Sequence, residues 1–128
     1  MKAASLLAVA LFLAASPALA TGTILCRSTI SPTDGPSLSL VVGNGEAGGI
    51  VQAHFALGGE RFTTGEGPGA PVISQAWIDP HALRLDVADA NVDARIFRLD
   101  ARRRRGSDYL GILIHGGRTW RVRCTEEG

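Results

Sequence analysis

The most prominent chemical feature of the sequence is the stretch DARRRRGSDYLG, in which four arginines follow one another: Arg102, Arg103, Arg104 and Arg105. Two more arginines, Arg121 and Arg123, alternate with other residues in the later stretch RTWRVRC. A guanidinium group presents its donors in a planar fork that matches the paired oxygens of carboxylate and phosphate groups. We therefore take these six arginines as candidate anion-binding residues.

Charge is distributed unevenly along the chain. Residues 21–94 hold three arginines and eight acidic residues, whereas residues 95–123 hold nine arginines and two acidic residues. A basic segment favours an anionic partner: an envelope polysaccharide, a lipid phosphate or an acidic protein surface. Two other interpretations stay open. The run can be the solvated part of a turn, because Gly106-Ser107-Asp108 follows it, or the acidic part can neutralise the basic part within the fold or across a dimer.

A nucleic acid partner is not expected. After Lys2 the arginines and acidic residues balance, and only Tyr109 and Trp120 offer stacking surfaces near the basic residues.

Metal sites and catalytic motifs are not expected either. The stretch DVADANVD resembles a calcium loop, but with Asp89 as first ligand it has Ala94 where glycine is needed and Asp100 in place of glutamate. The three histidines, His54, His81 and His115, show no zinc-ligand spacing. The glycine-rich stretch GNGEAGG lacks the lysine of a phosphate loop, and no serine lies in a GxSxG context. We expect no cofactor and no enzyme, with a small hydrolase as the third-ranked function.

Residues 1–20, MKAASLLAVALFLAASPALA, have the features of a signal peptide. Lys2 precedes an apolar run over residues 3–15, and Ala18 and Ala20 have the spacing of a cleavage site. The run is shorter than the roughly 20 residues that span a bilayer, so no transmembrane segment is expected. The alternative is a buried N-terminal helix. We expect a single exported domain over residues 21–128, in the periplasm or secreted.

The two cysteines, Cys26 and Cys124, lie near opposite ends of this domain. In an exported protein an isolated pair of cysteines indicates a disulfide. Such a bond would make the first and last elements of the domain neighbours, because bonded cysteines have Cα atoms about 5.5 Å apart. The alternative is two buried thiols.

Apolar and polar residues alternate with period two between glycine clusters, which is typical of short antiparallel strands. Gly58-Gly59 predicts a tight hairpin that places Phe55 opposite Phe62. The inward residues predicted from the alternation are Leu38, Leu40, Val42, Val51, Ala53, Phe55, Leu57, Leu83, Leu85, Val87, Trp120, Val122 and Cys124. Arg121 and Arg123 are predicted to point outward. In the last hairpin, a two-residue turn pairs Leu113 with Trp120 and a three-residue turn pairs Ile112 with it, and the sequence does not choose between them.

Residues 91–105 are compatible with two elements. As a strand, Phe97, Leu99 and Ala101 alternate with charged residues. As a helix, Val92, Ile96 and Leu99 form a stripe that Asn91 caps and Gly106 ends. We favour the strand because the neighbouring segments are strands. The fold class predicted is all-β: a small antiparallel meander barrel or barrel-like sandwich of eight or nine short strands.

The stretches WIDPHALRLDVADANV and YLGILIHGGRTWRVRC resemble a group of short exported bacterial proteins of unassigned activity. This resemblance covers most of the chain after residue 20 and brings no functional residue with it. In size, export, barrel architecture and terminal disulfide the chain is also similar to periplasmic lysozyme inhibitors. Their Ser-Gly-Tyr loop motif has no clear counterpart, since GSDY at residues 106–109 is a poor match.

These observations predict a non-enzymatic exported domain that binds an anionic component of the envelope or inhibits an envelope-acting enzyme. The second interpretation is a structural envelope protein whose arginines neutralise its own acidic residues.

Overall fold

The computed structural model describes residues 22–43, 49–103, 106 and 108–127. The predicted signal peptide, residues 1–20, lies outside this range, and so does the centre of the glycine-rich stretch at residues 44–48. Within the described residues the regular elements are all strands: β1 (Gly22–Ser28), β2 (Ser37–Gly43), β3 (Gly49–Leu57), β4 (Glu60–Thr63), β5 (Val72–Ile78), β6 (Ala82–Ala88), β7 (Arg95–Arg103), β8 (Tyr109–His115) and β9 (Arg118–Glu127).

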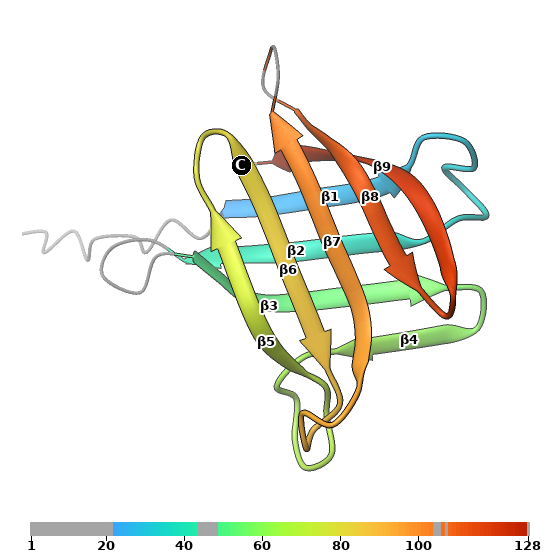
Figure 1. Cartoon of the computed structure of the whole chain (residues 1–128), viewed down its shortest axis with the longest axis vertical. Helices are drawn as coiled ribbons and strands as arrows, with labels where there is room; N and C mark the ends of the chain where they lie inside the picture. Colours follow the sequence, from blue (N-terminus) through green and yellow to red (C-terminus); the bar gives the residue numbers. More distant parts are fainter. Residues whose placement is uncertain (1–21, 44–48, 104–105, 107, 128) are drawn as a thin grey trace, which may run out of the picture.

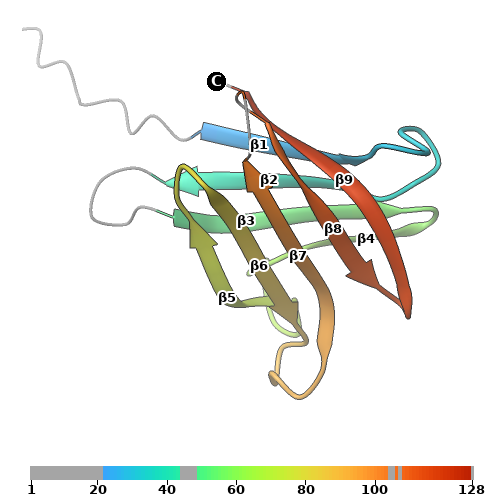
Figure 2. The same ribbon diagram turned by 45° about the horizontal axis from the view of Figure 1, so that its top comes forward.

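All nine strands belong to one sheet in the order β4-β3-β2-β1-β9-β8-β7-β6-β5. The sheet curls on itself as a half-barrel. Figure 1 shows β1 to β4 as one layer and β5 to β8 crossing it, while β9 bends from one layer to the other. The predicted all-β class and the barrel-like arrangement are therefore confirmed, with β4 and β5 as the two edges of the sheet (Figure 2).

The first and last strands are neighbours in this sheet. Cys26 of β1 lies opposite Cys124 of β9, and a disulfide joins them with a Cα–Cα distance of 4.0 Å. The predicted disulfide is confirmed, and it indicates that the chain folds in an oxidising compartment. No helix in the described part of the chain has the length and apolar character needed to cross a bilayer.

The core fills the space between the two layers. Most of the predicted inward residues are buried, including Leu38 and Leu40 of β2 and Leu83, Leu85 and Val87 of β6. A group of four aromatic rings joins the layers: Phe55 stacks on Phe62 with centroids 4.8 Å apart, on Phe97 at 5.3 Å, and contacts the ring of His115 at 4.8 Å. The predicted pairing of Phe55 with Phe62 is confirmed.

Glycine turns determine the register of the two hairpins that contain them. Leu57 pairs with Glu60 around Gly58-Gly59. In the last hairpin His115 pairs with Arg118, so the turn has two residues, and Leu113 pairs with Trp120. Gly116 and Gly117 both have positive φ, 58° and 73°, as a type I′ turn requires.

The segment that was compatible with a helix or a strand is a strand over Arg95–Arg103, with Phe97, Leu99 and Ala101 buried. The three-dimensional context decides this, because the pairing of β7 with both β6 and β8 satisfies its backbone hydrogen bonds.

One predicted inward residue is wrong. Val51 is 53% exposed, and Ile50 is buried in its place. The cause is a β-bulge: Val41 pairs with Gln52 and Val42 pairs with Ile50, so Val51 has no partner of its own. An extra residue reverses the alternation on one side of the bulge, and period-two reasoning does not detect it.

A second bulge lies in the edge strand β5. Ile73 pairs with Val87 and Gln75 pairs with Asp86, which leaves Ser74 as the extra residue. Ile73 therefore packs against the core, whereas Gln75 and Trp77 lie opposite outward residues of β6.

Strands β7 and β8 approach closely at Gly111, which pairs with Ala101. A Cβ atom added at Gly111 would collide with the Cα atom of Ala101 and with the carbonyl oxygen of Asp100. We expect Gly111→Ala to destabilise the protein by about 3 kcal/mol or more, since backbone atoms must move to accept the methyl group. Urea denaturation measures this change.

The matched control is Gly59→Ala. A Cβ atom at Gly59 meets no atom within 4 Å, and its φ lies outside the left-handed region. This control should unfold close to the wild-type midpoint. Equal destabilisation of the two variants would contradict a close approach at Gly111.

Candidate anion-binding face

Three arginines on three different strands lie in one row across the outer face of the sheet. Arg102 of β7 pairs with Leu110 of β8, Leu110 pairs with Arg123 of β9, and Arg123 pairs with Arg27 of β1. Arg102, Arg123 and Arg27, here called the basic row, are all exposed. Arg121 lies on the same face of β9, opposite Ile112.

The basic row places like charges close together. Arg27 and Arg123 are direct cross-strand partners, an arrangement that destabilises a sheet by mutual repulsion. Asp108 relieves part of this repulsion, because its Oδ2 accepts a hydrogen bond from Nη1 of Arg123 at 3.3 Å. Within the described part of the chain, no carboxylate forms an ion pair with Arg102 or Arg121. Both guanidinium groups can accept an external anion without breaking an ion pair.

Arg103 has a different environment from its neighbour Arg102. Its Nη2 donates to Oε1 of Glu126 at 2.9 Å, and its guanidinium lies over the Tyr109 ring, 4.3 Å from the centroid. Tyr109 is buried and donates its hydroxyl to the carbonyl oxygen of Asp79 at 2.7 Å. Burial raises the pKa of Tyr109, so the phenol stays a neutral donor at physiological pH. Arg103 therefore covers this end of the core and lies apart from the basic row.

The other predicted site residues divide between the described and undescribed parts of the chain. Arg121 and Arg123 point outward as predicted, and Arg102 joins them through the register of β7, β8 and β9. Arg104 and Arg105 lie outside the described residues. Arg27 was missed because its position opposite Arg123 depends on the pairing of β1 with β9, between residues almost a hundred positions apart.

Two further arginines on this face are neutralised internally. Arg98 binds the carboxylate of Asp86 through Nε at 2.8 Å and Nη2 at 2.9 Å. These hydrogen bonds lower the pKa of Asp86 and raise that of Arg98, so both groups are charged throughout the neutral range. Arg84 forms a longer ion pair with Asp100, with Nε–Oδ1 at 3.5 Å.

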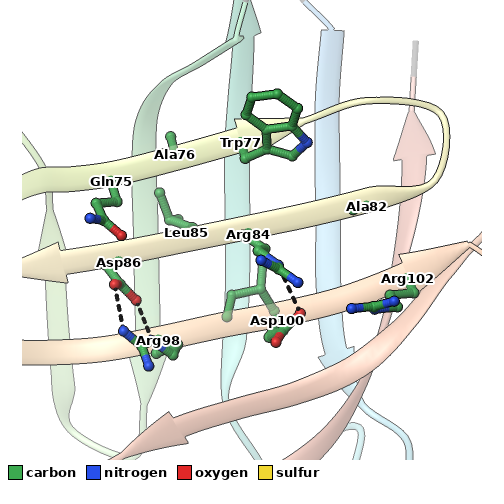
Figure 3. A pocket seen from close by; sticks show the side chains of 11 residues that line it. Gln75, Ala76, Trp77, Ala82, Arg84, Leu85, Asp86, Arg98, Asp100 and Arg102 are labelled. Atoms are coloured by element: carbon green, nitrogen blue, oxygen red, sulfur yellow. Dashed lines mark hydrogen bonds and ion pairs between the residues drawn. The ribbon is translucent and has the colours of Figure 1, made fainter.

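A groove of about 760 Å³ runs over the outer face of β5, β6 and β7. Figure 3 shows the two ion pairs on its floor, Trp77 standing on β5 at one side and Arg102 at the end of β7. Arg102 thus belongs both to the groove and to the basic row. Among the residues that the structure describes, those that line the groove are Gln75, Ala76, Trp77, Ala82, Arg84, Leu85, Asp86, Arg98, Leu99, Asp100 and Arg102.

Trp77 is 60% exposed and is held by the turn that follows it. Its indole Nε1 donates to Oδ2 of Asp79 at 2.9 Å, while Oδ1 of Asp79 accepts the backbone N–H groups of His81 and Ala82, each at 2.7 Å. The bond from Trp77 and those from the two backbone amides lower the pKa of Asp79, so its carboxylate is ionised at neutral pH. Nothing in the sequence indicated that Trp77 lies on the outer face, because its outward position results from the bulge at Ser74.

Metal-ligating residues do not come together in the part of the chain that the structure describes, where no three His, Cys, Asp or Glu side chains could hold one ion. In the stretch that resembles a calcium loop, Asp89 closes a turn: its Oδ1 accepts the backbone N–H of Asp93 at 2.7 Å. Asp86, on β6, is bound to Arg98.

Comparisons with protein-family models, curated proteins and solved structures found no match to this chain. The resemblance to short exported proteins and the architectural likeness to lysozyme inhibitors stay predictions. The assignment of a function depends on the chemistry of the outer face.

The pKa of His115, the last residue of β8, is raised. Burial lowers its pKa, but hydrogen bonds to the Ile96 carbonyl oxygen and the Glu60 carboxylate, together with the charge of Glu60, raise it above the ordinary value. The two ring nitrogens lie 2.8 Å and 3.0 Å from these acceptors. Only the protonated ring can donate to both.

We therefore expect the stability of the protein to depend on pH through His115. Because the folded-state pKa is raised, the stabilisation is complete below the unfolded value of about 6.5 and is lost as the pH rises through the folded value. Thermal unfolding between about pH 6 and 9 should show a falling midpoint for the wild type and a smaller fall for His115→Gln. An unchanged slope in His115→Gln would contradict this assignment.

Proposed function

We propose that the protein is an exported, non-enzymatic binding domain for an anionic component of the cell envelope, and that the basic row together with Arg121 binds this component. The proposal extends to periplasmic or secreted localisation after removal of residues 1–20. The oxidising compartment indicated by the disulfide supports this localisation.

The observation that carries the proposal is the cross-strand row of Arg102, Arg123 and Arg27. A fold that needed these side chains only for solubility would gain nothing from placing Arg27 opposite Arg123, since the two charges repel. A bound carboxylate or phosphate converts this repulsion into charge-assisted hydrogen bonds. The curved strand β9 lies between β1 of one layer and β8 of the other, and so connects the strands that carry these arginines (Figure 2).

The alternative is a structural envelope protein whose charges neutralise one another. The ion pairs of Arg84, Arg98, Arg103 and Arg123 with acidic side chains favour it. The guanidinium groups of Arg27, Arg102 and Arg121 have no acidic partner among the described residues. These three arginines distinguish the two functions, because internal neutralisation does not account for them.

The test compares the oxidised protein that begins at residue 21 with the variant Arg27→Ser/Arg102→Ser/Arg121→Ser, which removes the three arginines without an acidic partner among the described residues. Heparin and purified lipopolysaccharide are titrated at low and at physiological salt. We expect wild-type affinity to weaken with salt, as it does for exposed charges, and to fall about tenfold or more in the variant, a change of about 1.4 kcal/mol.

The control variant is Arg61→Ser/Arg95→Ser/Arg118→Ser, which removes the same number of charges from exposed arginines that do not belong to the basic row. It should retain most of the affinity. An equal loss in the two variants would mean that net charge alone is responsible, and no binding by the wild type at physiological salt would favour the structural alternative.

A further inference from the structure

The groove beside the basic row has an aromatic platform. Trp77 exposes a large part of its indole, while the polar edge of the ring is already bonded to Asp79. A ligand at this position therefore meets the ring face, which is apolar and carries negative charge density. One face of a sugar ring consists of C–H groups with a slight positive charge, and it is complementary to such a surface.

The floor of the groove is polar but close to neutral. Arg84 is paired with Asp100 and Arg98 with Asp86, and Gln75 lies opposite Asp86 on the neighbouring strand. Carboxylate, amide and guanidinium groups offer both acceptors and donors in planar arrangements, and neighbouring hydroxyl groups bind to them in pairs. The Arg84–Asp100 pair is exposed and long, so it can rearrange toward a ligand at little cost.

The end of the groove at Arg102 is basic. Arg102 lies two strands away from Trp77 in the sheet order, which corresponds to about 10 Å at the usual strand spacing. A ligand that touches both residues is therefore longer than one sugar ring. From Arg102 it can continue over Leu110 toward Arg123.

We propose that the groove binds an acidic glycan, with one sugar ring stacked on Trp77, its hydroxyl groups on the floor of the groove and an acidic group at Arg102. Asp79 is a positioning residue, because it fixes the indole through Nε1 and is itself fixed by two backbone amides. This inference rests on the proposed function and names the class of ligand that the basic row would serve.

An anionic lipid surface fits the same face less well. Leu110 and Ile112 are 45% and 37% exposed, but each has a charged residue as its partner on both neighbouring strands. An acyl chain lying across the groove would remove water from two ion pairs and receive no hydrogen bond in return, which is costly. A glycan replaces those water contacts with its own hydroxyl groups.

The experiment measures the binding of four probes to the oxidised protein at physiological salt: a fluorescent hexamer of galacturonic acid, maltohexaose, inorganic polyphosphate and phosphatidylglycerol vesicles. Trp77→Ala should bind the acidic hexamer about tenfold more weakly than the wild type, because the stacking surface is gone. Its affinity for polyphosphate, which needs only the arginines, should be unchanged. Val51→Ala is the matched control, since it trims another exposed apolar side chain, on β3, and should bind as the wild type does.

The outcomes separate the two proposals. Equal binding of the acidic hexamer by the wild type and Trp77→Ala would overturn the glycan site and leave the basic row as an anion site. Tighter binding to phosphatidylglycerol vesicles than to the hexamer would assign the face to lipid and overturn the glycan site as well. If neither the hexamer nor polyphosphate binds to the wild type, the proposed function fails, and the glycan site fails with it.

A second measurement does not depend on the stability of Trp77→Ala. Trp120→Phe leaves Trp77 as the only tryptophan, so the fluorescence of this variant reports on the groove. The acidic hexamer should shift its emission, whereas polyphosphate should leave the emission unchanged. An unchanged emission spectrum at hexamer concentrations that saturate binding would overturn stacking on Trp77.

Discussion

The pairing of β1 with β9, fixed by the disulfide between Cys26 and Cys124, holds the two layers of the sheet in one register. The bond joins residues 98 positions apart, and closing a loop of that size stabilises a folded chain by about 4 to 5 kcal/mol in the chain-entropy model. That contribution is comparable with the whole stability of many small domains, about 5 to 15 kcal/mol. The same pairing brings Arg27 opposite Arg123, so the basic row exists only when the two ends of the domain are joined.

Local patterns were sufficient to predict most of the fold. The period-two alternation predicted the inward leucines of β2 and β6, and Gly58-Gly59 predicted the turn after Leu57. The length of the turn at Gly116-Gly117 was not predicted, and the structure shows that it has two residues. The alternation failed at Val51, where a bulge inserts an extra residue. The energetic difference between a regular and a bulged strand depends on packing against the neighbouring strand, and a single sequence does not contain that information in readable form.

The candidate site was only partly predictable, for a related reason. Arg121 and Arg123 alternate with the buried residues Val122 and Cys124, so their outward direction followed from the sequence. The different environments of Arg102 and Arg103 depend on which strands flank β7. The outward position of Trp77 depends on the bulge at Ser74. Cross-strand neighbours, rather than neighbours along the chain, create the surface chemistry of this protein. The positions of the residues that form the groove and the basic row are determined by the register in which the strands pair.

The two edges of the sheet differ from its interior strands in a way that affects the behaviour of the protein at high concentration. An open edge presents unpaired backbone groups that can recruit a strand from another molecule. Here one edge, β4, has only four residues, and the other, β5, is interrupted by the extra residue Ser74, whose hydroxyl donates to the carbonyl oxygen of Asp86 within the same molecule. A short edge and a kinked edge are poor templates for intermolecular strand pairing, so we expect the half-barrel to resist fibrous aggregation although its sheet stays open between β4 and β5.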